Sequence, residues 1–216
     1  MLAVDTTTPR ASVALAGPEG VLAEARAVSD SGHSRWLLPA IEGLLRDAGL
    51  EPGAIDLFAV TTGPGSFTGL RVGLGTVQGL ALASRKRCFG LSSLDVLAHT
   101  AKGEAGTVVA LVDAFRGEVF AGVYDGEARL QGERRVGPLT AILQGLPRGS
   151  VFVGEAASAS RTAIEAAVPG AVFPETSGFL AAPLALVALS SEEAAVGPGE
   201  LRPLYLRGAD IRPSRT

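Results

Sequence analysis

A glycine-rich segment between a buried strand and a long apolar helix constrains the fold of this chain more than any other feature. The expected strand covers residues 56–62, a turn follows at Gly63-Pro64-Gly65, and helical spacing covers residues 67–84. Four glycines lie inside that helix: Gly69, Gly73, Gly75 and Gly79. A glycine inside a helix costs roughly 1 kcal/mol relative to alanine, so four cost about 4 kcal/mol. The sequence therefore predicts that something packs very close to this helix.

The spacing of the glycines leaves open what this close neighbour is. Gly65, Gly69 and Gly73 are spaced by four residues, which places them on one face of the helix. The same spacing relates Gly75 to Gly79. A helix that is apolar nearly all round is either buried in its own core or shared with a partner. Both interpretations fit the pattern.

The glycine-rich turn does not match a standard phosphate-binding fingerprint. A Walker loop that started at Gly65 would need glycine and then lysine where Leu70 and Arg71 stand. A dinucleotide fingerprint that started at Gly63 would need glycine where Thr68 stands. Backbone N–H groups at a helix N-terminus can bind anions, but the residues here favour close packing over nucleotide binding.

Two expected strands end in aspartate. Asp5 closes the first strand and precedes Thr6 and Thr7, and Asp113 closes a strand in the second half of the chain. Carboxylate and hydroxyl groups at such strand ends could hold a metal-bound phosphate, which makes these four residues the candidate ATP or ADP ligands. Turns stabilised by the Asp and Thr side chains, or a cluster of salt bridges, explain the same residues without a ligand.

Metal-binding and nucleophile patterns are absent from the sequence. His33 and His99 are the two histidines, and their separation carries no metal-ligand spacing. The lone cysteine, Cys88, lies between basic residues and an apolar strand, with no base beside it in sequence. The Gly-x-Ser-x-Gly signature of serine hydrolases is missing. We therefore expect neither a metal site nor a catalytic residue in this chain.

The net charge of −3 over 216 residues argues against a surface that binds nucleic acid as a whole. The last 15 residues are locally basic, with Arg202, Arg207, Arg212 and Arg215 against a single acid, Asp210. This composition is typical of a frayed, solvated tail. A weak contact with RNA is the alternative.

No targeting or membrane segment is expected. The N-terminus lacks a basic start and reaches an acid at Asp5, unlike a signal peptide. Residues 67–84 carry one charge, Arg71, but their glycines and Gln78 fit a buried helix better than a membrane span. We therefore expect a cytoplasmic protein.

The order of elements predicts two α/β lobes, at residues 1–104 and 105–216, with the boundary near residues 102–107. Three strands open each half, and alternating helices and strands follow. In the first half, strands are expected at 2–5, 11–16, 20–28, 56–62 and 88–91, and helices at 34–48, 67–84 and 93–102. In the second, strands are expected at 107–113, 118–124, 128–136 and 150–154, and helices at 139–145, 157–167 and 180–190.

Several of these segments together resemble the bacterial TsaB (YeaZ) family. They are Asp5-Thr6-Thr7, the run from His33 to Ile41, the run from Gly63 to Gly73, and the run from Asp113 to Val119. The Gly-Pro-Gly-Ser-Phe-Thr-Gly-Leu-Arg run is the most specific of them. The resemblance implies a two-lobed, actin-like fold of the ASKHA, ribonuclease-H-like group, here with a shortened second lobe.

The family resemblance also implies a function. It implies an accessory, non-catalytic subunit needed to make N6-threonylcarbamoyladenosine at position 37 of ANN-decoding tRNAs, with no cofactor required by this chain. The implied partners are a catalytic TsaD-like subunit, a TsaE-like ATPase, a second copy of this chain, and tRNA indirectly through the complex. An ATP-binding, ATP-hydrolysing or protease-like enzyme of the ASKHA group is the alternative.

The resemblance implies that the glycine-rich helix is the partner interface. The interface residues would be Phe67, Gly69, Leu70, Val72, Gly73, Thr76, Val77 and Leu80. On this hypothesis, leucine at Gly69 or Gly73 blocks association and leaves the monomer folded. The catalytic relative carries a His-x-x-x-His metal pair, and alignment puts Ser93 and Leu97 at those positions here, which favours a non-catalytic subunit.

Overall fold

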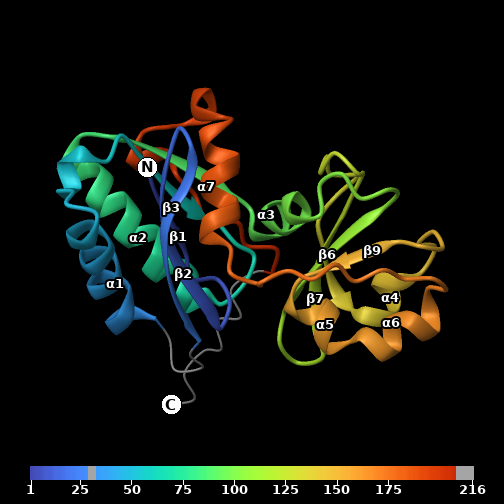
Figure 1. Ribbon diagram of the computed structural model, residues 1–216. Coiled ribbons are helices and arrows are strands. Elements are labelled where there is room, and N and C mark those ends of the chain that lie inside the picture. The colour runs from blue at the N-terminus through green and yellow to red at the C-terminus, as the bar shows by residue number, and fades with distance from the viewer. Residues whose placement is uncertain (29–32, 208–216) are drawn as a thin grey trace, which may run out of the picture.

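Two β-sheets flanked by helices make up residues 1–28 and 33–207, the part of the chain that this computed structural model describes (Figure 1). The first sheet has the strand order β3-β2-β1-β4-β5. Its strands are β1 (Leu2–Asp5), β2 (Arg10–Gly17), β3 (Gly20–Val28), β4 (Leu57–Thr61) and β5 (Arg87–Leu91). This sheet and the helices on it form the first lobe.

The second sheet repeats the topology of the first with one strand fewer. Its order is β8-β7-β6-β9, from β6 (Val108–Asp113), β7 (Glu118–Tyr124), β8 (Arg135–Pro138) and β9 (Val151–Val153). In both sheets the first strand pairs antiparallel with the second and parallel with the fourth. The described part of the second lobe has no counterpart of β5 in its sheet. The predicted two-lobed α/β fold with a shortened second lobe is therefore confirmed.

Helices cover both faces of the first sheet (Figure 1). α1 and α2 lie on one face, α7 lies on the other, and α3 lies between the two sheets. The helices are α1 (Ser34–Asp47), α2 (Phe67–Ser84), α3 (Ser93–Thr100), α4 (Leu139–Leu143), α5 (Glu155–Ala159), α6 (Arg161–Ala167) and α7 (Ala181–Leu189). Within the described ranges, no helix is long and apolar enough to cross a membrane.

The alternation of side chains along β1 explains how each face of the first sheet is covered. Leu2 and Val4 point to one face, where they join the core beneath α1 and α2. Ala3 points to the other face, where the neighbouring strands also present alanines, such as Ala14 and Ala59. These small side chains allow α7 to pack close to the sheet through residues such as Leu184.

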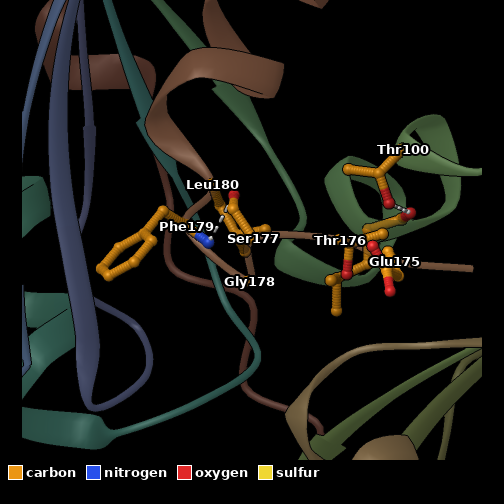
Figure 2. Close-up of a pocket in the computed structure, with 8 residues that line it drawn as sticks. Thr100, Glu175, Thr176, Ser177, Gly178, Phe179 and Leu180 are labelled. Atoms are coloured by element: carbon orange, nitrogen blue, oxygen red, sulfur yellow. Dashed lines mark hydrogen bonds between the residues drawn. The ribbon is translucent and has the colours of Figure 1, made fainter.

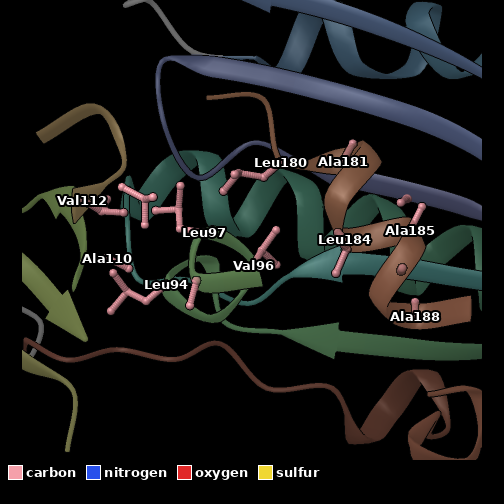
Figure 3. Packing of buried hydrophobic residues seen from close by; sticks show 14 of the residues in the cluster. Leu94, Val96, Leu97, Ala110, Val112, Leu180, Ala181, Leu184, Ala185 and Ala188 are labelled. Carbon is pink, nitrogen blue, oxygen red and sulfur yellow. The ribbon is translucent and has the colours of Figure 1, made fainter. Parts of the chain in front are cut away.

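α3 and α7 join the lobes in one continuous core (Figure 3). α3 contributes Leu94 and Leu97, which pack with Val112 of β6 on one side and with α7 on the other. α7 lies in the half of the sequence assigned to the second lobe, yet it packs on β1, β2 and β4. The boundary expected near residues 102–107 therefore separates the two sheets, but the chain returns to the first lobe after the second sheet.

One predicted strand was too long. The expected strand at residues 128–136 begins only at Arg135, and its first two positions, 128 and 129, lie in a tight turn formed by residues 125–129. The Asp125 carboxylate accepts hydrogen bonds from the backbone N–H groups of Glu127 and Arg129, and Ala128 has a φ of 60°. Aspartate at the start of a turn competes with strand pairing in this way.

The close neighbour predicted for α2 is the chain's own strand end. A Cβ atom on Gly69 would overlap the carbonyl oxygen of Thr6, and one on Gly73 would overlap the Thr6 hydroxyl. The Thr6 hydroxyl donates a 2.7 Å hydrogen bond to the Gly69 carbonyl. The backbone N–H of Ser66 donates one, also 2.7 Å, to the carbonyl of Thr7. These contacts leave no room for a side chain on this face of α2.

The other pair of glycines has no such neighbour. A Cβ atom on Gly75 or Gly79 would meet no atom of residues 1–28 and 33–207 within 4 Å, and both glycines are exposed. The same spacing of four residues therefore marks two different faces of α2: one face packs on Thr6, and the other is open. The expectation that leucine at Gly69 or Gly73 leaves the monomer folded does not fit this geometry, because either side chain would push α2 away from β1.

The two sets of glycines give opposite predictions for alanine. We expect Gly69→Ala to destabilise the protein by about 1–3 kcal/mol, because its methyl group overpacks the contact with Thr6. Gly75→Ala, the matched control in the same helix, should stabilise it by about 0.5–1 kcal/mol through helix propensity. Urea denaturation followed by circular dichroism measures both values. Equal effects of the two substitutions would contradict the packing described here.

Candidate functional site

A cavity of about 270 Å³ lies where β1 and β6, the central strands of the two sheets, end opposite each other. We call this cavity the cleft. The first lobe lines it with Thr7, Thr8, Pro9, His33, Ser66 and Gly69, and the second lobe with Val112, Asp113, Phe115 and Glu155. Hydroxyl, imidazole and carboxyl groups from both lobes therefore surround one space.

Asp5 lies behind the cleft wall, fully buried. Its Oδ1 accepts hydrogen bonds from the Thr7 N–H at 3.1 Å and from the hydroxyls of Thr7 and Thr61, each at 2.6 Å. Its Oδ2 has no hydrogen-bond partner among the described residues. Burial raises the pKa of the Asp5 carboxyl above its ordinary value, while the hydrogen bonds to its charged form partly oppose that shift.

The structure places two of the four candidate nucleotide ligands at the cleft and the other two behind its wall. Thr7 and Asp113 line the cleft, whereas Asp5 and Thr6 lie behind it. Thr6 uses its hydroxyl to hold α2 and is not turned to the cleft. Asp5 therefore acts on the cleft through Thr7, whose backbone and side chain it fixes.

Glu155 and His33 are cleft residues that sequence reasoning did not select as ligands. Glu155 opens α5 directly after β9, and its Oε1 accepts a 3.3 Å hydrogen bond from the Asp113 N–H. Burial raises the pKa of Glu155, and the nearby Asp5 and Asp113 charges add to that shift. The Nε2 of His33 lies 2.9 Å from the Thr8 carbonyl oxygen. An acid directly after a strand was the signal for Glu155.

Within the part of the chain that the structure describes, the cleft presents no preformed metal centre. Among the described residues, no three His, Cys, Asp or Glu side chains gather where they could hold a metal ion. The two positions aligned with the histidines of the catalytic relative lie in α3. Ser93 donates a 2.5 Å hydrogen bond to the Pro64 carbonyl, and Leu97 is 1% exposed within the core.

A second cavity, of about 160 Å³, lies between α3 and residues 175–180 (Figure 2). Thr100, Glu175, Thr176 and Ser177 supply its polar groups. The Thr100 hydroxyl already donates a 2.6 Å hydrogen bond to the Leu97 carbonyl. With one carboxylate and less space, this cavity is a weaker candidate site than the cleft.

The outward face of α2 is the second notable surface of the first lobe. Of the eight predicted interface residues, Phe67 is exposed and Val72, Thr76 and Leu80 are half-buried. The remaining four are buried against the chain's own core: Gly69, Leu70, Gly73 and Val77. The outward face also carries Gly75, Gly79 and Leu82, the last 72% exposed. Arg71 is the one charged residue of the helix.

The two related sheets, the cleft between them and the helices α3 and α7 that connect the lobes define an actin-like α/β protein. A solved structure from Clostridium difficile, the activator of 2-hydroxyisocaproyl-CoA dehydratase with bound ADPNP, shares this fold with a TM-score of 0.56. It is 13% identical in sequence, and the match covers 95% of this chain and 99% of that one. This likeness concerns the fold alone.

Closer relatives define the family. A family model described as "TsaD: tRNA N6-adenosine threonylcarbamoyltransferase" matches residues 20–190. The structure of YeaZ from Pseudomonas aeruginosa is 32% identical, with a TM-score of 0.76 over 95% of this chain and 98% of that chain. The chain therefore belongs to the TsaB (YeaZ) family of actin-like proteins.

Two further relatives carry functional descriptions. The Escherichia coli K12 "tRNA threonylcarbamoyladenosine biosynthesis protein TsaB" is 38% identical over 122 residues, which cover 56% of this chain. The match spans about half, 52%, of that protein's length. Another Pseudomonas aeruginosa structure, 31% identical with a TM-score of 0.79 over 95% of this chain and 98% of that chain, is described as similar to peptidase YeaZ.

The buried Asp5 predicts a specific pH dependence of stability. Burial raises the pKa of the Asp5 carboxyl in the folded state above its unfolded pKa of 3.8. The carboxyl therefore adds its full contribution to the folding stability below pH 3.8, and this contribution is lost as pH rises through the folded pKa. Asp5→Asn keeps the acceptor oxygen and cannot ionise. We expect the variant to gain stability relative to the wild type as pH rises from 4 to 8, measured by urea denaturation.

Glu155 remains in both proteins, so the comparison isolates Asp5 and its effect on Glu155. A wild-type curve that rises relative to the variant over the same range would show that the folded protein holds Asp5 as a stabilised carboxylate.

Proposed function

We propose that this chain is the non-catalytic subunit of a complex that makes N6-threonylcarbamoyladenosine at position 37 of ANN-decoding tRNAs. A TsaD-like catalytic subunit binds the outward face of α2, and a TsaE-like ATPase joins the pair. The chain reaches tRNA through this complex, and it pairs with a second copy of itself when the catalytic subunit is absent. The name of the Escherichia coli relative supports the pathway.

The observation that carries the partner surface is the pair of glycines on the outward face of α2. A Cβ atom on Gly75 or Gly79 would meet no atom of the described residues within 4 Å, so packing among those residues does not explain the two glycines. Each costs helix stability, roughly 1 kcal/mol relative to alanine. A second helix that crosses α2 at this point would approach closely over the two glycines and bury Leu82, which is 72% exposed.

The cleft supports a non-catalytic role. A zinc-type or iron-type site of the catalytic relative's kind needs imidazole ligands, and Ser93 and Leu97 stand at those positions and serve packing. Ser66 is the serine that lines the cleft, so it is the residue to consider as a hydrolase nucleophile. It accepts a 3.2 Å hydrogen bond from the Gly69 N–H as the N-cap of α2. The Ser66 oxygen therefore serves as a cap for the backbone of α2.

A charged side chain on the outward face of α2 tests the partner surface. We expect Gly75→Arg to fold normally, because the site is open, and to bind a TsaD-like subunit at least about tenfold more weakly than the wild type. Isothermal titration calorimetry with the purified subunit measures the affinity. Reconstituted tRNA modification should fall in parallel, because the complex is the active species.

Two variants serve as controls. Gly75→Ala shows the effect of losing the glycine alone. Leu186→Arg places the same charge on α7, at a position that is 50% exposed on the opposite face of the sheet. Unchanged affinity in Gly75→Arg would move the interface away from α2. Modification that proceeds without this chain would refute the proposed function.

ATP binding in the cleft is the competing function, favoured by the hydroxyls and by the α2 N-terminus that face it. The carboxylates of Asp113 and Glu155 oppose it, because they repel phosphate unless a cation screens them. We therefore expect calorimetry with Mg-ATP and the isolated chain to show no binding in the micromolar range, and no hydrolysis of ATP or peptides. Tight binding that is lost in Asp113→Ala would instead establish the ATP-binding alternative.

A further inference from the structure

The segment that follows α7 ties the two lobes together. We call residues 201–207 the C-terminal strap. Leu201 packs into the core beneath α2, and the backbone N–H of Leu204 donates a 2.7 Å hydrogen bond to the carbonyl of Thr62, just after β4. Three residues further on, Arg207 binds the second lobe: it donates a 3.1 Å hydrogen bond to the Ala114 carbonyl and pairs with Glu118.

The middle of the strap lies against the outward face of α2. The Tyr205 ring packs on Phe67 with ring centres 5.6 Å apart. The Arg71 guanidinium lies 3.9 Å from the centre of the Phe67 ring, and its Nε donates a 3.3 Å hydrogen bond to the Tyr205 hydroxyl. Phe67 and Tyr205 remain 46% and 45% exposed, so anything that docks along α2 meets this corner.

The end of the strap holds a turn that lines the cleft. This turn connects β6 to β7 and carries Phe115 and Arg116, whose φ angles of 60° and 57° are both left-handed. The Asp113 carboxylate accepts a 2.9 Å hydrogen bond from the Phe115 N–H within the same turn. Arg207 binds the turn at both of its ends, through Ala114 and Glu118. The position of Arg207 therefore affects how Asp113 and Phe115 face the cleft.

Tyr205 touches α2 and Arg207 holds the turn, and only Leu206 lies between them in the sequence. Leu206 packs in the core shared by the two lobes. We propose that the C-terminal strap couples the outward face of α2 to the cleft. A partner that docks on Phe67, Arg71 and Tyr205 fixes the strap, and Arg207 then fixes the β6–β7 turn. Coupling of this kind is reciprocal, so a group bound in the cleft changes affinity at α2 by the same factor.

The identity of the docking partner rests on the proposed function, whereas the coupling is a property of this chain and is tested first without a partner. Hydrogen–deuterium exchange reports on the turn, because the Ala114 and Glu118 N–H groups bond within it. We expect Arg207→Ala and Tyr205→Ala each to raise the exchange of these two amides by about fivefold or more. Tyr205→Phe, which removes only the hydroxyl that Arg71 contacts, should give a smaller increase.

Arg202→Ala is the matched control, because within the described residues Arg202 bonds only locally, to the carbonyls of Gly199 and Leu201. It should leave the exchange of the turn unchanged, and urea denaturation confirms that each variant is folded. If Arg207→Ala raises exchange and neither Tyr205 variant does, the strap holds the turn without transmitting anything from α2, and the coupling is refuted.

Adding the TsaD-like subunit separates the coupling from the proposed function. We expect it to protect the Ala114 and Glu118 amides in the wild type and not in Arg207→Ala. Binding without this protection refutes the coupling and leaves the proposed function standing. Absence of binding refutes the proposed function, and the Tyr205 variants of the isolated chain then decide whether the strap connects α2 to the cleft.

Discussion

The contact between α2 and the turn after β1 determines the two surfaces of the first lobe that matter for function. Gly69 and Gly73 let the helix backbone lie directly on Thr6, and Ser66 bonds to Thr7. This contact brings the first turn of α2 to the cleft and fixes its rotation about its own axis. The opposite face, with Gly75 and Gly79, consequently points to solvent. One packing constraint therefore places both the cleft and the candidate partner surface.

Most of the fold could be predicted because its strands and helices have clear hydrophobic patterns, but the orientation of α2 could not be read from glycine spacing. A spacing of four shows that two glycines share a face, not which face is buried. The larger side chains contained that information: Leu70, Leu74 and Val77 lie on the buried side, the same side as Gly69 and Gly73. The positions of the bulky apolar residues around the helix therefore show which glycines face the protein core and which face solvent.

The candidate site was predicted only where ligands follow a strand directly. Asp5, Thr7 and Asp113 were found in this way, and Asp5 proved to support the cleft wall rather than line it. Glu155, two residues after the last residue of β9, carried a similar signal that was passed over, whereas His33 precedes α1 and only the folded chain brings it to the strand ends. The sequence also did not predict that α7 packs on the first sheet. Because α7 is apolar on all sides, it has no single apolar face that would indicate which sheet it covers.

The return of α7 to the first sheet has a consequence for synthesis on the ribosome. The strands of the first lobe are complete by Leu91, but α7, the helix that packs on the face presenting Ala3, Ala14 and Ala59, comes only at residues 181–189. A nascent chain therefore carries an uncovered apolar sheet while it makes the entire second lobe. Chains that stop early would keep this surface exposed, which makes them substrates for chaperones and proteases. The first lobe to be translated is the last to be finished.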